Sequence, residues 1–343
     1  MQSVFKYELD KIESENIKKY CDSVDYCAIE QSLGWTQMFF RSRICYFYLQ
    51  DESGIRCFSQ IHESLRSAQI IFGPVCCEMD IMLNSINEII KYYKIRHFIY
   101  LGIQMYYKSG FETDYIEYKL NKLHKIQYRF NTENTKSSIE LNLESPIEEI
   151  YSTFRKGHKS DIKKASKMGI IVDSVRDSNE LNSFVEVYSK MCQVRKINDE
   201  GISIDKITDI YNFLIENNKG YFLIVRDSSG IVIGGAILVF QGISLRYFKG
   251  TTDPDRRDLP ILHLLMYEAI KKAKIDNFKY FDLWGYNHFA ADNDQVYNIN
   301  HFKKGFGGYY TFFAKKMNIN LIPEGYNIYR ILLFMKGILK KIL

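Results

Sequence analysis

The chain has 343 residues, of which 46% are hydrophobic and 25% charged, and its net charge is +5. This apolar fraction, together with 26 Tyr and 23 Phe, excludes an intrinsically disordered protein. No apolar run approaches the roughly 20 residues that a bilayer span needs, so the sequence also argues against a membrane-spanning protein. At roughly 150 residues per domain, the length predicts two domains.

The first residues of the chain lack the apolar core of a signal peptide, and we therefore expect a cytoplasmic protein. The seven cysteines form an odd set without a CxxC pair, which indicates free thiols in a reducing compartment. His158, His263, His288 and His301 show none of the spacings of a metal site, so we expect no bound metal.

A β-hairpin is predicted at two places in the chain. Residues 46–61 and 221–240 each contain two apolar, β-branched or aromatic runs around an Asp/Ser/Gly turn. Each hairpin is followed by a further strand, a proline-containing loop, an amphipathic helix and a final aromatic strand. The second of these helices, near 260–274, has apolar residues at helical spacing, and Pro260 suits its first turn.

One long segment of the chain is repeated. Residues 88–103 (EIIKYYKIRHFIYLGI) and 268–283 (EAIKKAKIDNFKYFDL) share seven of sixteen positions at a constant offset of 180. Chance would give about one or two matches. The common order ββ-β-α-β predicts a duplicated α/β unit, with the boundary near 130–140 in the polar stretch NTENTKSS.

A dense cationic patch opens the second copy. It contains Arg155, Lys156, Lys159, Lys163 and Lys164, and positions 156, 159 and 163 fall on one helical face. This spacing suits contact with phosphates or with a nucleic-acid backbone. The alternative is a solvated basic helix face.

The end of the sequence predicts an amphipathic helix. Residues 326–343 (YNIYRILLFMKGILKKIL) carry an apolar stripe at i, i+3, i+4 and i+7, with four cations and no acid. Such a helix is too short and too charged to span a bilayer, but it can lie in the interface of an anionic inner leaflet. Packing of the stripe against the protein body is the alternative.

Four motifs occur in an order that is typical of one family. They are QSLGW at 31–35, Gly-Pro-Val at 73–75, FRKGHKSDIKKASKMGIIV at 154–172 and HFKKGFGGYY at 301–310. Together they resemble the Fem-type aminoacyltransferases, which build peptidoglycan cross-bridges and consist of two tandem GNAT acyltransferase domains. The resemblance implies an α/β (α+β) fold with mixed central sheets flanked by helices. It also implies a first GNAT-like domain over 1–135, a second over 136–325, and a basic amphipathic C-terminal helix over 326–343.

The sequence departs from this family pattern in three places. Residues 251–284 hold no glycine, although a CoA-dependent GNAT protein needs a glycine-rich turn around the pyrophosphate. The span 196–220 is too short for the coiled-coil arm of the staphylococcal type. Phe39 stands where a basic residue often follows the first motif, and the nearest cation is Arg41.

The resemblance implies catalytic residues near the C-terminal motif. Lys303 matches the lysine of the family's Phe-Lys motif, which is implicated in the transition state, and Phe302 would hold Lys303 in place by packing. A fixed ammonium just beyond a strand end can stabilise the oxyanion that forms during acyl transfer to an amine. The alternative is that Lys303 and Lys304 are solvated loop lysines.

Two strand residues are further catalytic candidates. Tyr247 can donate its phenol hydrogen to the acceptor or leaving group, or it is a core tyrosine. Asp282 ends a strand and either orients the amine or has a structural capping role. The substrate-binding candidates are Arg155, Lys156, Lys159, Arg195, Lys304 and Trp35.

The resemblance implies an acyltransferase that forms an amide bond. The donor is then aminoacyl-tRNA, and the acceptor is an amine of a lipid-linked or nucleotide-linked cell-envelope precursor, such as the peptidoglycan stem peptide. No cofactor is expected, with acyl-CoA as the alternative donor. One competing hypothesis is an acyl-CoA-dependent N-acyltransferase that acts on an amino sugar of a surface polysaccharide, and another is a non-catalytic RNA- or membrane-binding module. For the enzyme, the expected location is the cytoplasm, at the inner face of the plasma membrane.

Overall fold

A computed structural model describes residues 1–40, 42–108, 111–124, 126–127, 137–196, 206–288, 290 and 295–342. The chain divides into two compact units: Met1–Lys136 with Phe312–Leu343, and Ser137–Thr311. The predicted domain boundary, at residues 135 and 136, lies outside the described residues. So does Arg41, the cation nearest to the first family motif.

The first unit is built on a mixed sheet. Its strands are β1 (Gln2–Lys6), β2 (Arg43–Asp51), β3 (Gly54–Ser64), β4 (Ser67–Ile71), β5 (Val75–Cys76), β6 (Tyr100–Gln104), β7 (Ile126–Gln127) and β15 (Met317–Asn320). Its helices are α1 (Lys11–Ser23), α2 (Met79–Ile95), α3 (Phe111–His124) and α10 (Gly325–Ile342), with short 3₁₀ turns at Ile29–Gln31 and Thr36–Met38. The strand order is β1-β2-β3-β4-β6-β15-β7, and β5 pairs with β3.

Apolar side chains of the first unit are buried on both faces of this sheet. On one face Phe47, Cys57 and Ile61 pack with Ile86 and Ile89 of α2. On the other face the alternate strand residues pack with the buried side of α1; they include Tyr46, Tyr48 and Phe58. The period-two alternation of the strands therefore supplies both cores.

The second unit contains the other mixed sheet. Its strands are β8 (Ser137–Asn142), β9 (Ile171–Ser174), β10 (Gly220–Arg226), β11 (Val232–Gln241), β12 (Ser244–Thr252), β13 (Tyr280–Asp282) and β14 (Tyr309–Phe312). Its helices are α4 (Ile147–Ser152), α5 (Lys156–Lys167), α6 (Ser178–Arg195), α7 (Ile207–Glu216), α8 (Ile261–Ile275) and α9 (Gln295–Lys304), with a 3₁₀ turn at Pro254–Arg256. The strand order is β14-β8-β13-β12-β11-β10-β9.

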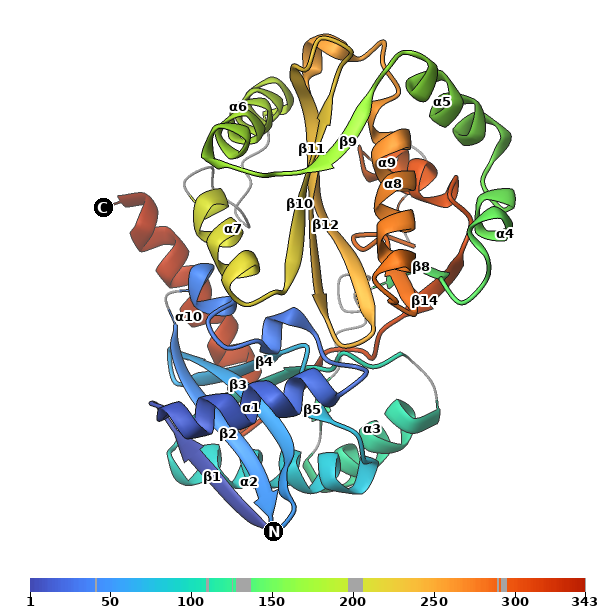
Figure 1. The fold of residues 1–343 in the computed structure, drawn as a ribbon. Helices are drawn as coiled ribbons and strands as arrows, with labels where there is room; N and C mark the ends of the chain where they lie inside the picture. Colours follow the sequence, from blue (N-terminus) through green and yellow to red (C-terminus); the bar gives the residue numbers. More distant parts are fainter. Residues whose placement is uncertain are drawn as a thin grey trace. The chain divides into compact units, whose positions relative to one another are not determined.

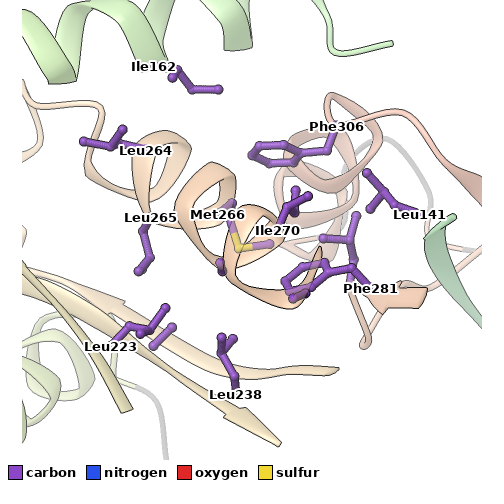
Figure 2. Packing of buried hydrophobic residues seen from close by; sticks show 14 of the residues in the cluster. Leu141, Ile162, Leu223, Leu238, Leu264, Leu265, Met266, Ile270, Phe281 and Phe306 are labelled. Atoms are coloured by element: carbon purple, nitrogen blue, oxygen red, sulfur yellow. The ribbon is translucent and has the colours of Figure 1, made fainter. Parts of the chain in front are cut away.

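Helices cover both faces of the second sheet. In Figure 1, α6 and α7 lie over one face, while α8 lies over the other, with α5 beyond it. Figure 2 shows Leu265 and Met266 of α8 facing Leu223 and Leu238 of the sheet, with Phe306 at the end of the same cluster. These buried contacts fix α8 and the chain around Phe306, which follows α9.

The predicted duplication is confirmed. The order β2-β3-β4-α2-β6 in the first unit matches β10-β11-β12-α8-β13 in the second. Both hairpins form, β4 pairs in parallel with β6, and β12 pairs in parallel with β13. The helix expected near 260–274 begins one residue later, at Ile261, because Pro260 is its N-cap.

The end of the chain differs from the expected domain division. The sequence places residues 312–325 in the second domain, whereas Phe312–Leu343 belong to the first unit. The physical reason is strand pairing: Met317 and Ile319 of β15 lie opposite Ile103 and Leu101 of β6 and are buried in that core.

The helix expected over 326–343 forms as α10 and partly packs on its own unit. Tyr329 is buried with Ile99 and Tyr100, while Ile331 and Phe334 are exposed. Within the part of the chain that the structure describes, every helix falls short of the length or the apolar character that a membrane span requires.

Candidate active site

The end of β13 and the last turn of α9 bring two candidate catalytic residues together. β12 and β13 pair in parallel from Ser244–Tyr280 to Arg246–Asp282, and the pairing ends there although β12 continues to Thr252. Asp282 therefore lies where the two strands part. Lys303, on α9, is close enough that the charge of Asp282 raises its pKa.

Lys303 is a buried lysine, with 7% of its surface exposed. Its ammonium donates to the backbone carbonyl oxygens of Trp284 and Gly285, the latter at 3.1 Å. Burial lowers the pKa of Lys303 to about 8, against the opposing effect of the Asp282 charge. An ammonium has three N–H donors. Among the described residues, two acceptors engage Lys303, one fewer than its number of donors.

Asp282 is fully buried and is held by several donors. The Ser138 hydroxyl and the Trp284 backbone N–H, at 2.8 Å, both donate to Oδ1. Arg246 Nε lies 3.5 Å from Oδ2. Burial raises the pKa of Asp282, and the Arg246 charge opposes this rise. The carboxyl thus links β8, β12 and the segment after β13.

The two residues that accept from Lys303 have unusual backbone conformations. Trp284 has φ +42° and Gly285 has φ +56°, so both lie in the left-handed region. A non-glycine residue there is strained, and such strain gathers at functional sites. The Trp284 ring lies 3.9 Å from the Arg246 guanidinium carbon, a cation–π contact that fixes the indole. This local structure turns two successive carbonyl groups toward Lys303.

Phe302 precedes Lys303 and packs on the core of the second unit. Its ring lies 5.1 Å from the ring of His263 and 5.1 Å from that of Phe306. Phe302 also lines a cavity of about 360 Å³ that reaches the first turn of α8, where Lys164, Arg256 and Arg257 contribute cations. Phe302, the residue before Lys303, therefore has its side chain against this cavity, whereas Lys303 is not among the described residues that line it.

Tyr247 and Arg195 form a second group. Tyr247 follows the last β12–β13 pair by one residue, next to a β-bulge opposite Ile237 and Leu238. Burial raises the pKa of Tyr247 to about 12, and the charge of Arg195 opposes this rise. The phenol is therefore protonated at neutral pH and can donate a hydrogen bond.

The other predicted substrate-binding cations lie on α5, at its start, and on α9. Arg155 and Lys156 are exposed at the start of α5, where Arg155 donates to His301 Nε2 at 2.7 Å, and Lys159 donates to the Ser152 carbonyl oxygen. Lys304 is exposed on α9, and a hydrogen bond to Tyr286 raises its pKa.

Trp35, the candidate in the first unit, is buried rather than open to a ligand. It is 1% exposed, and its ring packs 5.2 Å from that of Phe39. The Trp35 indole therefore packs inside the first unit and is not available to bind a substrate there.

Sequence reasoning missed three residues around Lys303. Arg246 and Trp284 were missed because their importance comes from a contact between separate segments. His158 is buried on α5 and contacts the Phe302 carbonyl oxygen. A signal for His158 exists: it shares one helix face with Ile162 and Ala165, the buried face of an otherwise basic helix.

Comparisons with known proteins agree with this fold. The family model of a GNAT acetyltransferase domain matches residues 152–303. The lipid II:glycine glycyltransferase of Staphylococcus haemolyticus is 30% identical over 87 residues, which is 25% of this chain and 21% of that protein. The chain thus matches about a fifth of the length of that relative.

Solved structures resemble nearly the whole chain. The crystal structure of FemX has a TM-score of 0.80 at 15% identity, over 96% of this chain and 99% of that one. A tandem GNAT protein from the clavulanic acid biosynthesis pathway has a TM-score of 0.53 at 8% identity, over 94% and 99%. The expected fold, two tandem GNAT-like units with mixed sheets, is confirmed.

Proposed function

We propose that this chain is a Fem-type tandem GNAT protein and an acyltransferase that forms an amide bond on a peptidoglycan precursor. The observation that carries the proposal is Lys303, a buried ammonium held by two carbonyl groups beside the point where β12 and β13 part. The named activity of the glycyltransferase relative supports the same reaction class.

The reaction is an attack of an acceptor amine on the carbonyl carbon of an acyl ester. A C–N bond forms, the ester C–O bond breaks, and the proton lost by the amine leaves with the alcohol. Negative charge develops on the carbonyl oxygen in the tetrahedral intermediate. The remaining N–H of Lys303 is the donor for this oxyanion, and burial strengthens the interaction because water does not screen it.

Tyr247 and Asp282 have supporting roles in this proposal. The Tyr247 phenol, which stays protonated, donates to the leaving alcohol or the acceptor. Asp282 keeps Lys303 charged through its own negative charge and holds the Trp284 backbone, whose carbonyl group orients the ammonium.

For the donor we propose aminoacyl-tRNA. The exposed cations at the start of α5, Arg155 and Lys156, suit contact with phosphates of an RNA end. Acyl-CoA is a second candidate, and the cavity at the start of α8 favours it, because cations and a helix N-terminus suit phosphate groups. The acids Asp161 and Asp258 also line that cavity and weaken its attraction for a diphosphate.

For the acceptor we propose a membrane-anchored precursor, in line with the name of the relative. The exposed Ile331, Phe334 and Met335 of α10, with the cations of residues 326–343, would hold the protein at an anionic membrane surface. The enzyme and a lipid-linked substrate would then share one plane.

The test is a transfer assay with the full chain. The protein is incubated with aminoacyl-tRNA or acetyl-CoA, each with a lipid-linked and a nucleotide-linked muropeptide, and the acceptors are analysed by mass spectrometry. We expect the mass gain of one aminoacyl residue with charged tRNA. Transfer from acetyl-CoA alone would contradict the proposed donor, and RNA or vesicle binding without any transfer would indicate a binding module.

A further inference from the structure

Residues 153–158, which join α4 to α5 and form the first turn of α5, contact the C-terminal end of α9. His158 Nε2 lies 2.8 Å from the Phe302 carbonyl oxygen, and the Arg155 backbone N–H donates to the Gly305 carbonyl oxygen at 2.8 Å. The Thr153 hydroxyl donates to the Ile150 carbonyl oxygen at 2.8 Å and lies 3.5 Å from the Phe306 carbonyl oxygen. Two donors from residues 153–158, the His158 ring and the Arg155 backbone N–H, therefore bind carbonyl groups on either side of Lys303 and Lys304.

These carbonyl groups need such partners because the last turn of a helix leaves its carbonyl oxygens without intrahelical donors. The Phe302 oxygen accepts from the Gly305 N–H at 3.0 Å and from His158. A carbonyl oxygen only accepts, so the His158 Nε2 carries the hydrogen. Burial lowers the pKa of His158, so the ring is a neutral donor.

The His158 ring is buried and packs against three other rings. Its ring centre lies 4.7 Å from that of Phe306, 4.6 Å from that of His263 and 5.5 Å from that of Phe302. A Cβ placed on Gly305 would lie 2.0 Å from His158 Nε2, so glycine is needed for this close approach. His158 is thus fixed from several sides while its one donor points at the residue before Lys303.

We infer that His158 is a positioning residue: by binding the Phe302 carbonyl oxygen it fixes the last turn of α9 and thereby the direction of the Lys303 ammonium. The inference rests on the proposed function, in which Lys303 stabilises the oxyanion. His158 itself contacts no reacting atom in this account. It acts through the backbone and through Phe302, which also lines the cavity.

The test compares two nearly isosteric variants in the transfer assay. His158→Gln keeps an N–H donor of similar reach, whereas His158→Met has a methyl group in its place. We expect His158→Met to lower kcat by about 10- to 100-fold with KM within about twofold, because a small misplacement of a catalytic group costs this much. His158→Gln should stay within about threefold of the wild-type kcat. The control His97→Asn, at an exposed residue of the first unit, should change neither constant.

Equal kcat values for the Gln and Met variants would overturn the inference. If His158→Met does not fold, His158→Asn takes its place, because its shorter amide does not reach the Phe302 oxygen.

A second readout does not depend on activity. Amide hydrogen exchange at Gly305 and Phe306 should be faster in the donor-less variant than in His158→Gln, and equal exchange would also contradict the inference. A wild-type protein without transfer activity, but with this exchange difference, would overturn the proposed function and leave the role of His158 in the fold intact.

Discussion

At the scale of single residues, the proposed site depends on the positive charge of Lys303, which lies where water is largely excluded. Lys303 is buried, which lowers its pKa to about 8, while Asp282 acts in the opposite direction. The backbone carbonyls of Trp284 and Gly285 replace part of the lost hydration. Such a lysine stays mostly charged at neutral pH and is still a stronger proton donor than an exposed one.

This balance predicts the pH dependence of transfer. The active form of Lys303 is the ammonium, so kcat should fall as the pH rises through about 8. Asp282→Asn removes the charge that raises this pKa, and the alkaline limb should therefore move to lower pH. The measurement is kcat against pH for both proteins, with spontaneous ester hydrolysis subtracted. An alkaline limb that Asp282→Asn leaves in place, or moves upward, would show that Lys303 does not produce it.

The sequence marked Lys303 and Asp282 as candidate residues, but it did not indicate which residues surround them. The motif at 301–310 and the strand end at 280–282 are local patterns, and local patterns can be read without a structure. The contact of Arg246 with Trp284 joins residues 38 positions apart, and that of His158 with Phe302 joins residues 144 positions apart. Contacts of this kind depend on how the elements pack.

At the scale of elements, two glycines near the contact between α5 and the end of α9 differ in the space around them. Gly305 lies under the His158 ring, where a Cβ would meet Nε2 at 2.0 Å. Gly157 is one residue from His158 on α5, and a Cβ there has nothing within 4 Å.

Alanine substitutions should separate these two cases. Gly305→Ala should lower the free energy of unfolding by about 1–3 kcal/mol, because the overpacked ring must move. The matched control Gly157→Ala should raise it by up to about 1 kcal/mol, because alanine loses less backbone entropy in a helix. Urea denaturation of both variants measures the difference. Equal free energies of unfolding for the two variants would mean that the His158 ring of α5 is not held against Gly305.

Element prediction succeeded where the signals were short-range. The two hairpins have Asp/Ser/Gly turns, and α8 has a regular apolar stripe, so both were predicted with nearly correct bounds. β15 could not be predicted as part of the first unit. Its four residues carry no signal for pairing with β6, a partner more than 200 positions earlier in the chain.

At the scale of the whole molecule, the net charge of +5 conceals an uneven distribution. Residues 151–167, 303–316 and 326–343 carry +5, +4 and +4, so the remainder of the chain carries −8. The first two basic segments include the start of α5 and the end of α9, where the proposed site lies. The third is α10, which combines its cations with exposed apolar residues.

Membrane binding should therefore depend on α10. The double variant Ile331→Asp/Phe334→Asp should lower binding to phosphatidylglycerol-containing vesicles at least tenfold, because two exposed apolar side chains are lost and acids are added. The control is Ile95→Asp/Ile275→Asp, at two other exposed isoleucines, which should bind as the wild type does. Cosedimentation with the vesicles, at low and at high salt, measures the binding of both double variants. Equal loss in the two double variants would contradict a specific role of α10.

The most direct test of the account is the rate of amide formation by Lys303→Ala, measured in single turnover with the full chain. Loss of an oxyanion donor should lower this rate by about 100- to 1,000-fold, while donor and acceptor binding stay near wild type. Lys315→Ala, at an exposed lysine outside the proposed site, should transfer at the wild-type rate. A Lys303→Ala protein that forms the amide as fast as the wild type would contradict the central claim.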